Sequence, residues 1–394
     1  MSRRKPAARA NRASSRGRIQ RVPRPVPAPV QHATMETAVA AEQDIEPQAL
    51  VVTNWFDSGS GHTPYVATVR LTGRRLGVLG PARPEDTFAR EETIQSVLPN
   101  AGRVSLTTWV YGIAAGEWDV RAELTRESDH PARALVSGRR RPHPIESLPR
   151  AAWSWRRWSL STAPDATIKT RMALLAPLAR IPAVAPGIWT ALGVLGVSMA
   201  VALLAVTGAG RGIPVSQSLL TSLLAVATGL AGAKIWFAVL APGPWYRALT
   251  RGWAVDGFLV VAPITAIALL LAQELPIGIY LDASAPGIFF AVAIGRVGCF
   301  LTGCCAGRMT RGRVGIWSSD RRVGARRVPA QLFESGAGLV IALVATGLVL
   351  LRPLPDGLVF VVALASYAVV RQLMLRIRAE ARTFSWRRSG PVAA

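Results

Sequence analysis

The sequence predicts a polytopic α-helical membrane protein that carries an all-β sandwich domain before its membrane region. From about residue 187 onward, apolar segments recur at the length of roughly 20 residues that a helix needs to cross a bilayer. Between residues 50 and 128, apolar and polar residues instead alternate with a period of two, which is typical of β-strands. The chain of 394 residues is long enough for more than one domain.

The first 45 residues are rich in Arg, Ala and Pro and contain no apolar stretch of the kind found in secretory signals. We therefore expect residues 1–45 to be a disordered basic tail rather than a signal peptide. A second basic tail is expected over residues 379–394.

Three alternating segments, 65–71, 104–110 and 118–124, are separated by turn-forming residues such as Pro99, Asn100 and Gly102. Short strands at this spacing predict a β-sandwich of immunoglobulin or fibronectin type over residues 50–128, which we expect to fold independently. No catalytic group of residues is evident there, so we interpret it as a binding or spacer module. The expected core residues are Val66, Val69, Leu106, Trp109, Trp118 and Val120.

Residues 129–170 form a predicted linker rich in Pro, Arg, Trp and Ser. It contains a run of aromatic and basic residues, Trp153 to Trp158. Such a run is typical either of an anchor at the membrane interface or of a solvated basic linker, and the sequence leaves both open.

The membrane domain is expected over residues 171–378. Its first part, 171–186, is apolar but interrupted by three prolines, which suggests an interfacial or re-entrant segment. About six spans follow, each close to the length a bilayer requires. Their expected ranges are 187–207, 217–240, 254–273, 283–304, 331–351 and 357–377.

The formal net charge is +23, and the excess is almost entirely arginine. Such a balance is compatible with nucleic acid or with anionic lipid as a partner. We favour lipid and expect no nucleic-acid partner, because the arginine clusters flank apolar spans, where they meet headgroups.

The most informative segment is 295–308, which reads GRVGCFLTGCCAGR and is followed by further arginines. An arginine at the end of a span requires an anionic partner or water. Glycines beside it allow a headgroup or another helix to approach the backbone. The segment therefore indicates either a site for an anionic headgroup or a positive flank that only orients the helix.

All three cysteines, Cys299, Cys304 and Cys305, lie in this one segment, which excludes a disulfide framework as the basis of the fold. The four histidines all lie before the membrane region, so we expect no metal site in the segment and no cofactor.

The segment 295–308 resembles the signature G-R-[IL]-G-N-F-[IL]-N-G-E-x-x-G of the prolipoprotein diacylglyceryl transferases. Other family motifs follow the same order between about Gly187 and Arg378. The matching segments are 232–235 for G-G-R-I, 282–286 for D-x-x-A-P, 327–334 for R-x-P-S-Q-L-Y-E and 367–371 for Y-G-x-x-R.

The resemblance implies a multi-pass protein of the bacterial plasma membrane that moves a diacylglyceryl group to an acceptor thiol. The donor would be phosphatidylglycerol or another anionic phospholipid, and the acceptor a lipoprotein precursor or another thiol. The implied catalytic residues are Arg296, Arg371 and Asp256, with the arginines on the phosphate. The implied substrate-binding residues are Lys234, Gly298, Gly303, Gly307, Arg308, Gln331 and Tyr367.

The sequence departs from the family pattern at several polar positions. Asp256 stands where the family has a histidine, and it is interpreted either as a base or as the partner of an arginine. Cys299, Thr302 and Cys304 replace two asparagines and a glutamate. One family span near the C-terminus has no counterpart. These departures favour an alternative, a non-catalytic lipid-binding membrane protein whose sandwich recruits a partner.

The sequence also gives conflicting indications of orientation. By charge, the N-terminus and the segment 305–329 should lie in the cytoplasm. The resemblance instead implies that the segment after the signature lies at the outer face. We favour a cytoplasmic N-terminal domain.

Overall fold

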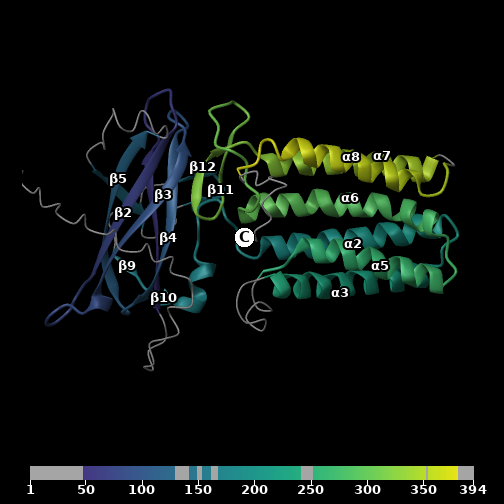
Figure 1. The fold of residues 1–394 in the computed structure, drawn as a ribbon, viewed down its shortest axis with the longest axis horizontal. Helices are drawn as coiled ribbons and strands as arrows, with labels where there is room; N and C mark the ends of the chain where they lie inside the picture. Colours follow the sequence, from purple (N-terminus) through teal and green to yellow (C-terminus); the bar gives the residue numbers. More distant parts are fainter. Residues whose placement is uncertain are drawn as a thin grey trace, which may run out of the picture. The chain divides into compact units, whose positions relative to one another are not determined.

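The computed structural model describes residues 48–128, 142–148, 153–160, 167–240, 252–351 and 354–379. The expected tail 1–45 lies outside these ranges, as do nearly all of the tail 379–394 and much of the linker 129–170. All elements described below belong to one compact unit, Ile45–Ala394. Its N-terminal part is an antiparallel sheet and its C-terminal part a set of apolar helices (Figure 1).

The sheet begins with five long strands, which include all three segments that the alternation predicted. They are β1 Gln48–Asp57, β2 Tyr65–Arg75, β3 Thr87–Val97, β4 Arg103–Ile113 and β5 Glu117–Ser128. Five shorter strands join them from later in the chain: β6 His143–Leu148, β9 Ile168–Lys169, β10 Arg171–Met172, β11 Ile316–Ser319 and β12 Val323–Arg327. The order along the main path is β11-β12-β4-β1-β6-β5-β2-β3, with β10 beside β1 and β9 beside β5. Every one of these pairings is antiparallel.

Three of the six expected core residues, Val69, Leu106 and Trp118, are fully buried in this sheet. Val66 is only partly buried, because the inward positions of β2 are the odd-numbered ones that include Val69. Side chains alternate between the two faces of a strand, so Val66, next to a buried position, points to the other face. The expectation that Val66 is in the core was wrong. Trp109 and Val120 are also only partly buried.

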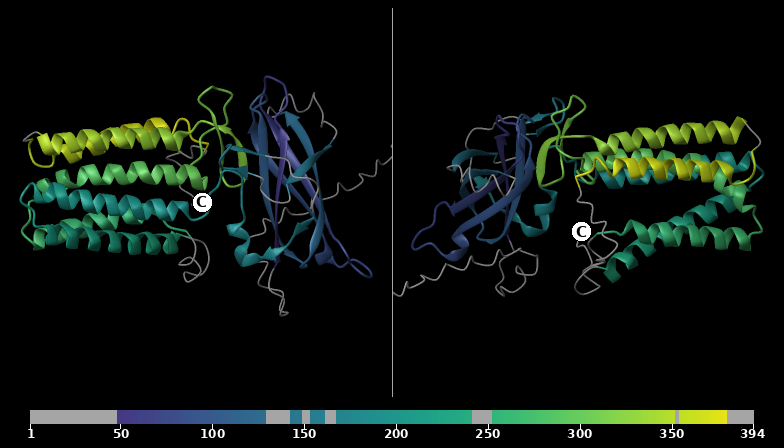
Figure 2. Two further views of the ribbon diagram at one scale, coloured as in Figure 1. Left: turned by 180° about the vertical axis from the view of Figure 1, so that it is seen from behind. Right: turned by 45° about the horizontal axis from the view of Figure 1, so that its top comes forward.

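The core of the sheet extends beyond residues 50–128. Ile168, Val323 and Ala325 are buried in the same apolar cluster as the long strands. The last two come from β12, which lies about 200 residues after β4 in the chain and pairs with it through Val323 opposite Leu106. The segment after the signature is therefore part of the sheet (Figure 2).

Six helices correspond to the six predicted apolar segments: α2 Ile188–Ala209, α3 Val215–Leu240, α5 Val255–Ala272, α6 Ile277–Thr302, α7 Ala330–Leu351 and α8 Leu358–Met374. Among the described residues, the first five are long and apolar enough to cross a membrane, whereas α8 has 17 residues. Helix α6 is the most buried of the five and packs against both α2 and α7, while α5 packs mainly on α3. Most apolar side chains on the other helices are exposed, as expected of a lipid-facing surface.

The pairing of β12 with β4 constrains how the chain crosses the membrane. Strands that hydrogen-bond to each other must lie on one side of the bilayer, so an even number of crossings must separate them. Within the described residues between β4 and β12, four helices are long enough to span: α2, α3, α5 and α6. The count is even, so the sheet and the signature segment are compatible with one membrane face.

The segment 171–186 contains strand β10, the short 3₁₀ helix η3 Ala173–Leu178 and turns. Ile181, Ala183 and Val184 are buried, and the amide of Ala185 donates a hydrogen bond of 2.8 Å to the carbonyl of Leu301 on α6. The segment is thereby attached to the end of α6 just before α2 begins.

Candidate functional site

A buried carboxylate, Glu334 on α7, is the centre of the candidate site. Its side chain is fully buried. Oε1 forms two ion pairs. It lies 2.8 Å from Nη2 of Arg296 on α6 and 3.2 Å from Nη1 of Arg371 on α8. Oε2 forms an ion pair with Arg378, which follows α8, and lies 3.1 Å from its Nη2. Three arginines from separate segments thus converge on one carboxylate, and we call these residues together with Tyr367 the Glu334 cluster.

Tyr367 completes the cluster. Its hydroxyl donates a hydrogen bond of 2.8 Å to Oε1 of Glu334 and accepts one of 3.3 Å from Nη2 of Arg296. Tyr367 and Arg371 lie four residues apart on α8, so both reach the cluster from one helix face. The Tyr367 ring packs against Phe289 of α6, with ring centroids 5.7 Å apart.

The charges of the Glu334 cluster do not cancel. One carboxylate faces three guanidinium groups, which leaves a formal excess of two positive charges. The side chains of Arg296 and Arg378 are 16% and 5% exposed, whereas that of Arg371 is 44% exposed and can meet a ligand from outside. Charge-assisted hydrogen bonds to a phosphate or carboxylate would offset this excess.

The predicted substrate-binding glycines allow the backbone to pack closely. A Cβ at Gly298 would lie 3.5 Å from Leu192 and Trp189, so this glycine faces α2. Gly303 ends α6 in the left-handed region at φ +74°, and a Cβ there would lie 2.5 Å from the carbonyl oxygen of Ser319. A Cβ at Gly307 would overlap the carbonyl oxygen of Val328. The space beside these three glycines is occupied by protein.

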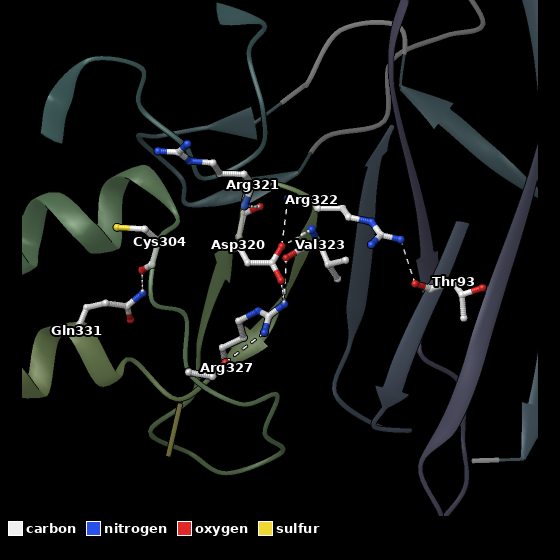
Figure 3. Close-up of polar contacts among 10 residues, drawn as sticks. Thr93, Cys304, Asp320, Arg321, Arg322, Val323, Arg327 and Gln331 are labelled. Atoms are coloured by element: carbon white, nitrogen blue, oxygen red, sulfur yellow. Dashed lines mark hydrogen bonds and ion pairs between the residues drawn. The ribbon is translucent and has the colours of Figure 1, made fainter. Parts of the chain in front are cut away.

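Arg308 and Gln331 likewise contact the protein backbone. Nε of Arg308 donates a hydrogen bond of 3.0 Å to the carbonyl of Arg378, and Gly307 forms an antiparallel bridge with the same residue. Nε2 of Gln331 donates one of 2.8 Å to the carbonyl of Cys304 (Figure 3). These contacts connect the signature segment to α7 and to the chain after α8.

Several arginines that follow the signature are also engaged with protein rather than free for a ligand (Figure 3). Arg327 is buried and pairs with Asp320 at 2.7 Å. Arg321 donates to the carbonyl of Thr302 at 3.0 Å. Arg322 pairs with Glu92 of the sheet at 2.6 Å and donates to the carbonyl of Thr93 at 3.0 Å. These three arginines are therefore held by protein groups, and the headgroup site suggested for the segment stays a prediction.

Lys234 and Asp256 lie in the α3–α5 pair, on helices that do not supply the Glu334 cluster. Nζ of Lys234 is 3.2 Å from the carbonyl of Gly252 and 4.3 Å from the centroid of the Trp253 ring. Asp256, at the start of α5, is exposed, and its side chain forms no hydrogen bond or ion pair with any other described residue. The structure therefore does not bring Asp256 to the cluster.

The three cysteines gather beside the cluster. Sγ of Cys304 lies 3.6 Å from the carbonyl oxygen of Cys299. Hydrogen bonds from the Cys299 and Cys304 thiols, followed by the positive charges of Arg378 and Arg296, hold the pKa of Cys305 below its usual range. In the described ranges, no group of three His, Cys, Asp or Glu side chains is arranged to hold a metal ion.

Sequence reasoning placed Arg296, Arg371 and Tyr367 among the site residues but omitted Glu334 and Arg378. Glu334 was present in the matched motif 327–334, and a glutamate at the start of an apolar helix is the signal that would have found it. Arg378 had no such signal, because it lies in an irregular segment among other basic residues.

Comparison with known proteins supports the motif reading. The family model for prolipoprotein diacylglyceryl transferase matches residues 178–392, more than half of the chain. A protein of Dehalococcoides mccartyi named phosphatidylglycerol--prolipoprotein diacylglyceryl transferase is 28% identical over 176 residues, covering 41% of this chain and 65% of that protein. A Clostridium perfringens protein named phosphatidylglycerol--prolipoprotein diacylglyceryl transferase 2 is 29% identical over 151 residues, covering 36% and 59%.

The chain thus spans less than two thirds of the length of these relatives. The matched region contains all five helices long enough to span and the whole Glu334 cluster. With these helices, the bacterial relatives identify a multi-pass protein of the bacterial plasma membrane.

Proposed function

Since this chain belongs to the prolipoprotein diacylglyceryl transferase family, we propose that it transfers a diacylglyceryl group from phosphatidylglycerol to an acceptor cysteine thiol. The observation that carries the proposal is the convergence of Arg296, Arg371 and Arg378 on Glu334. A site with two excess positive charges at membrane depth is suited to a phosphate group, and the relatives carry phosphatidylglycerol in their names.

In the proposed reaction, the acceptor sulfur forms a thioether bond to a glyceryl carbon of the lipid. The carbon–oxygen bond to the phosphate breaks, glycerol phosphate leaves with the electron pair, and the thiol proton passes to a base. The arginines stabilise the negative charge on the leaving phosphate, because a guanidinium group donates two parallel hydrogen bonds and stays charged. Glu334 holds Arg296 and Arg371 on the same oxygen and so sets their orientation before lipid binds.

Asp256 remains the proposed base, as the residue at the position of the family histidine. It is exposed and lies on α5, which packs mainly on α3, so it could act only on an acceptor that reaches the α3–α5 pair. Asp256→Asn tests this role, since it removes the charge and keeps the shape. Loss of transfer with unchanged lipid binding supports a base, and unchanged transfer refutes it.

The alternative function is a lipid-binding membrane protein without transferase activity, whose sandwich recruits a partner. It is favoured by the isolation of Asp256 from the cluster and by Cys299, Thr302 and Cys304 at polar family positions. Both functions share the lipid site, so transfer itself must be measured.

The finer features of the fold are proposals as well. We propose that the sheet domain is a sandwich of immunoglobulin or fibronectin type and that α8 is a sixth span. A helix of 17 residues is about 25 Å long, somewhat short of a hydrocarbon core of about 30 Å, so the bilayer would have to thin around it. We also propose that the sheet and the signature segment share the cytoplasmic face, in line with their arginine content.

The deciding experiment is complementation of a bacterial cell depleted of its own transferase, combined with transfer from radiolabelled phosphatidylglycerol to a cysteine peptide by the purified chain. We expect growth and a thioether product with the unmodified chain. Arg296→Ala should abolish transfer, and Arg296→Lys should restore little of it, because a point charge lacks the planar fork. Lipid binding without any product would favour the alternative function.

A further inference from the structure

A pocket of about 470 Å³ lies outside the Glu334 cluster, where three segments of the chain meet. The β3–β4 turn contributes Gly102, and β4 contributes its first residue, Arg103. The hairpin of β7 Trp153–Ser154 and β8 Ser159–Leu160 contributes aromatic residues, and β11 and β12 contribute Trp317 and Arg326. The volume falls within the range of small-molecule sites.

The walls of this pocket are tryptophan rings. Trp153 stacks on Trp317, with centroids 4.7 Å apart and planes 22° apart, and meets Trp158 edge-on at 5.3 Å. Trp158 in turn stacks on Phe300, at 5.9 Å and 6°. Phe300 lies two residues before the end of α6, so the pocket is at the level where a spanning helix leaves the bilayer. Tryptophan is enriched at that level because its ring is apolar and its N–H is polar.

The polar part of the pocket is cationic. Its lining includes Arg103 and Arg326 and no carboxylate. Neither arginine forms a salt bridge with a described residue, although Asp57 lies opposite Arg103 in the β1–β4 ladder. In the guanidinium group of Arg103, only Nη1 donates a hydrogen bond to a described residue, to the carbonyl of Leu160 at 3.2 Å. The Cζ atom of Arg103 lies 4.6 Å from the centroid of the Trp55 ring.

Arg326 is similarly held by carbonyls. Its Nε donates to the carbonyl of Gly315 at 3.2 Å and its Nη2 to that of Arg313 at 3.4 Å. Carbonyl contacts orient a guanidinium group without neutralising it. The pocket therefore combines two uncompensated positive charges with an aromatic wall, and an anionic group with an apolar part is its complement.

We propose that this pocket binds the headgroup of an anionic phospholipid from the adjoining leaflet. Arg103 and Arg326 are the phosphate donors, and the tryptophan rings contact the glyceryl backbone of the lipid. The site shares no residue with the Glu334 cluster and is independent of transfer. It exists only because the sheet and the 153–160 hairpin meet the segment after the signature.

The test is lipid retention by the full chain, purified in detergent with mixed phosphatidylglycerol and phosphatidylcholine and examined by native mass spectrometry. The double variant Arg103→Gln, Arg326→Gln should retain one phosphatidylglycerol fewer, with affinity at that site at least about tenfold weaker, because each charge-assisted hydrogen bond contributes more than that factor. Arg313→Gln is the matched control, an exposed arginine of the same segment that does not line the pocket. Equal retention by the double variant and the control overturns the proposal.

A second measurement leaves both arginines of the pocket unchanged, in case the double variant does not fold. Phosphatidylglycerol with a spin label near its headgroup should quench tryptophan fluorescence more than labelled phosphatidylcholine, and Trp317→Phe should remove part of that difference. Equal quenching by the two lipids overturns the proposal. Relief of quenching by millimolar glycerol phosphate would assign the pocket to a soluble phosphate ester and overturn the lipid assignment.

Discussion

Two fully buried carboxylates in the helical region, Asp282 on α6 and Glu334 on α7, have opposite surroundings. Asp282 accepts two backbone hydrogen bonds of 2.9 Å at the start of α8, from the amides of Gly357 and Phe360. Glu334 accepts ion pairs from three arginines and a hydrogen bond from Tyr367. Both residues lie in motifs shared with the family, yet only one is surrounded by excess charge.

The difference separates a carboxylate that caps a helix from one that, in the function we propose, positions the arginines of a ligand site. Asp282 satisfies amides that a helix N-terminus always leaves unpaired, and the helix dipole favours its charge. Its contacts use both carboxylate oxygens, and it forms no ion pair with a described residue. Glu334 instead leaves a surplus of guanidinium groups, one of them half-exposed, that a ligand can use.

The largest effect is expected for Glu334→Gln. This change leaves Arg296, Arg371 and Arg378 without their carboxylate, and breaking a buried ion pair in this way costs about 3–5 kcal/mol. Denaturant unfolding in detergent micelles measures the loss of unfolding free energy. Glu274→Gln, at an exposed glutamate outside the cluster, is the control and should change little. A Glu334→Gln protein as stable as the control would mean that the cluster is not an ion-pair centre.

The next largest effect is expected for Arg378→Gln. The Arg378 side chain is 5% exposed, so loss of its charged hydrogen bond to Glu334 should cost about 1.5–3 kcal/mol. Arg371→Gln is the matched comparison on the same carboxylate. Its side chain is 44% exposed, so its loss should cost less than about 1 kcal/mol in stability while weakening lipid binding. Equal losses of unfolding free energy for the two variants would contradict the view that Arg378 stabilises the fold while Arg371 faces the ligand.

Asp282→Asn should have a smaller and more local effect than Glu334→Gln. The amide retains one acceptor oxygen but loses the charge at the α8 N-terminus, which should cost about 1–2 kcal/mol. Hydrogen exchange should increase at residues 357–360 and remain unchanged in the Glu334 cluster. If Asp282→Asn destabilised the protein as much as Glu334→Gln, the two carboxylates would not differ in the way described.

The smallest effect is expected for the exposed Arg322–Glu92 pair, where the segment after the signature meets the sheet. Arg322→Gln removes the ion pair with Glu92. Because the Arg322 side chain is 48% exposed, the loss should lower the free energy of unfolding by only about 0.2–1 kcal/mol. Val323→Ser at the neighbouring buried position should cost more, because Val323 lies in the apolar core of the sheet. Thermal unfolding of both variants gives the order, and the reverse order would mean that charge rather than burial attaches β12 to β4.

The Glu334 cluster shows how far the sequence predicts a site. Arg296, Tyr367 and Arg371 were identifiable because each lies in a short motif on an apolar helix, where an ionisable group is unusual. Glu334 stood in such a motif too, but its three arginine partners lie 38 residues before it and 37 and 44 residues after it, and no local pattern relates them. The sequence predicted that glycines 298, 303 and 307 leave space for substrate. A glycine indicates a close approach but not which group approaches, and in the structure that group is protein.

The sequence by itself determined the apolar helices, the alternating strands and the family of the membrane region, because these depend on local periodicity and short motifs. Only the tertiary structure decided that β12 completes the N-terminal sheet and that most arginines after the signature bind protein. It also decided that the tryptophans of the 153–160 hairpin stack on Trp317 and Phe300. The physical reason is that ion pairs and ring contacts form between residues up to 230 positions apart, and each partner lies in a different part of the sequence.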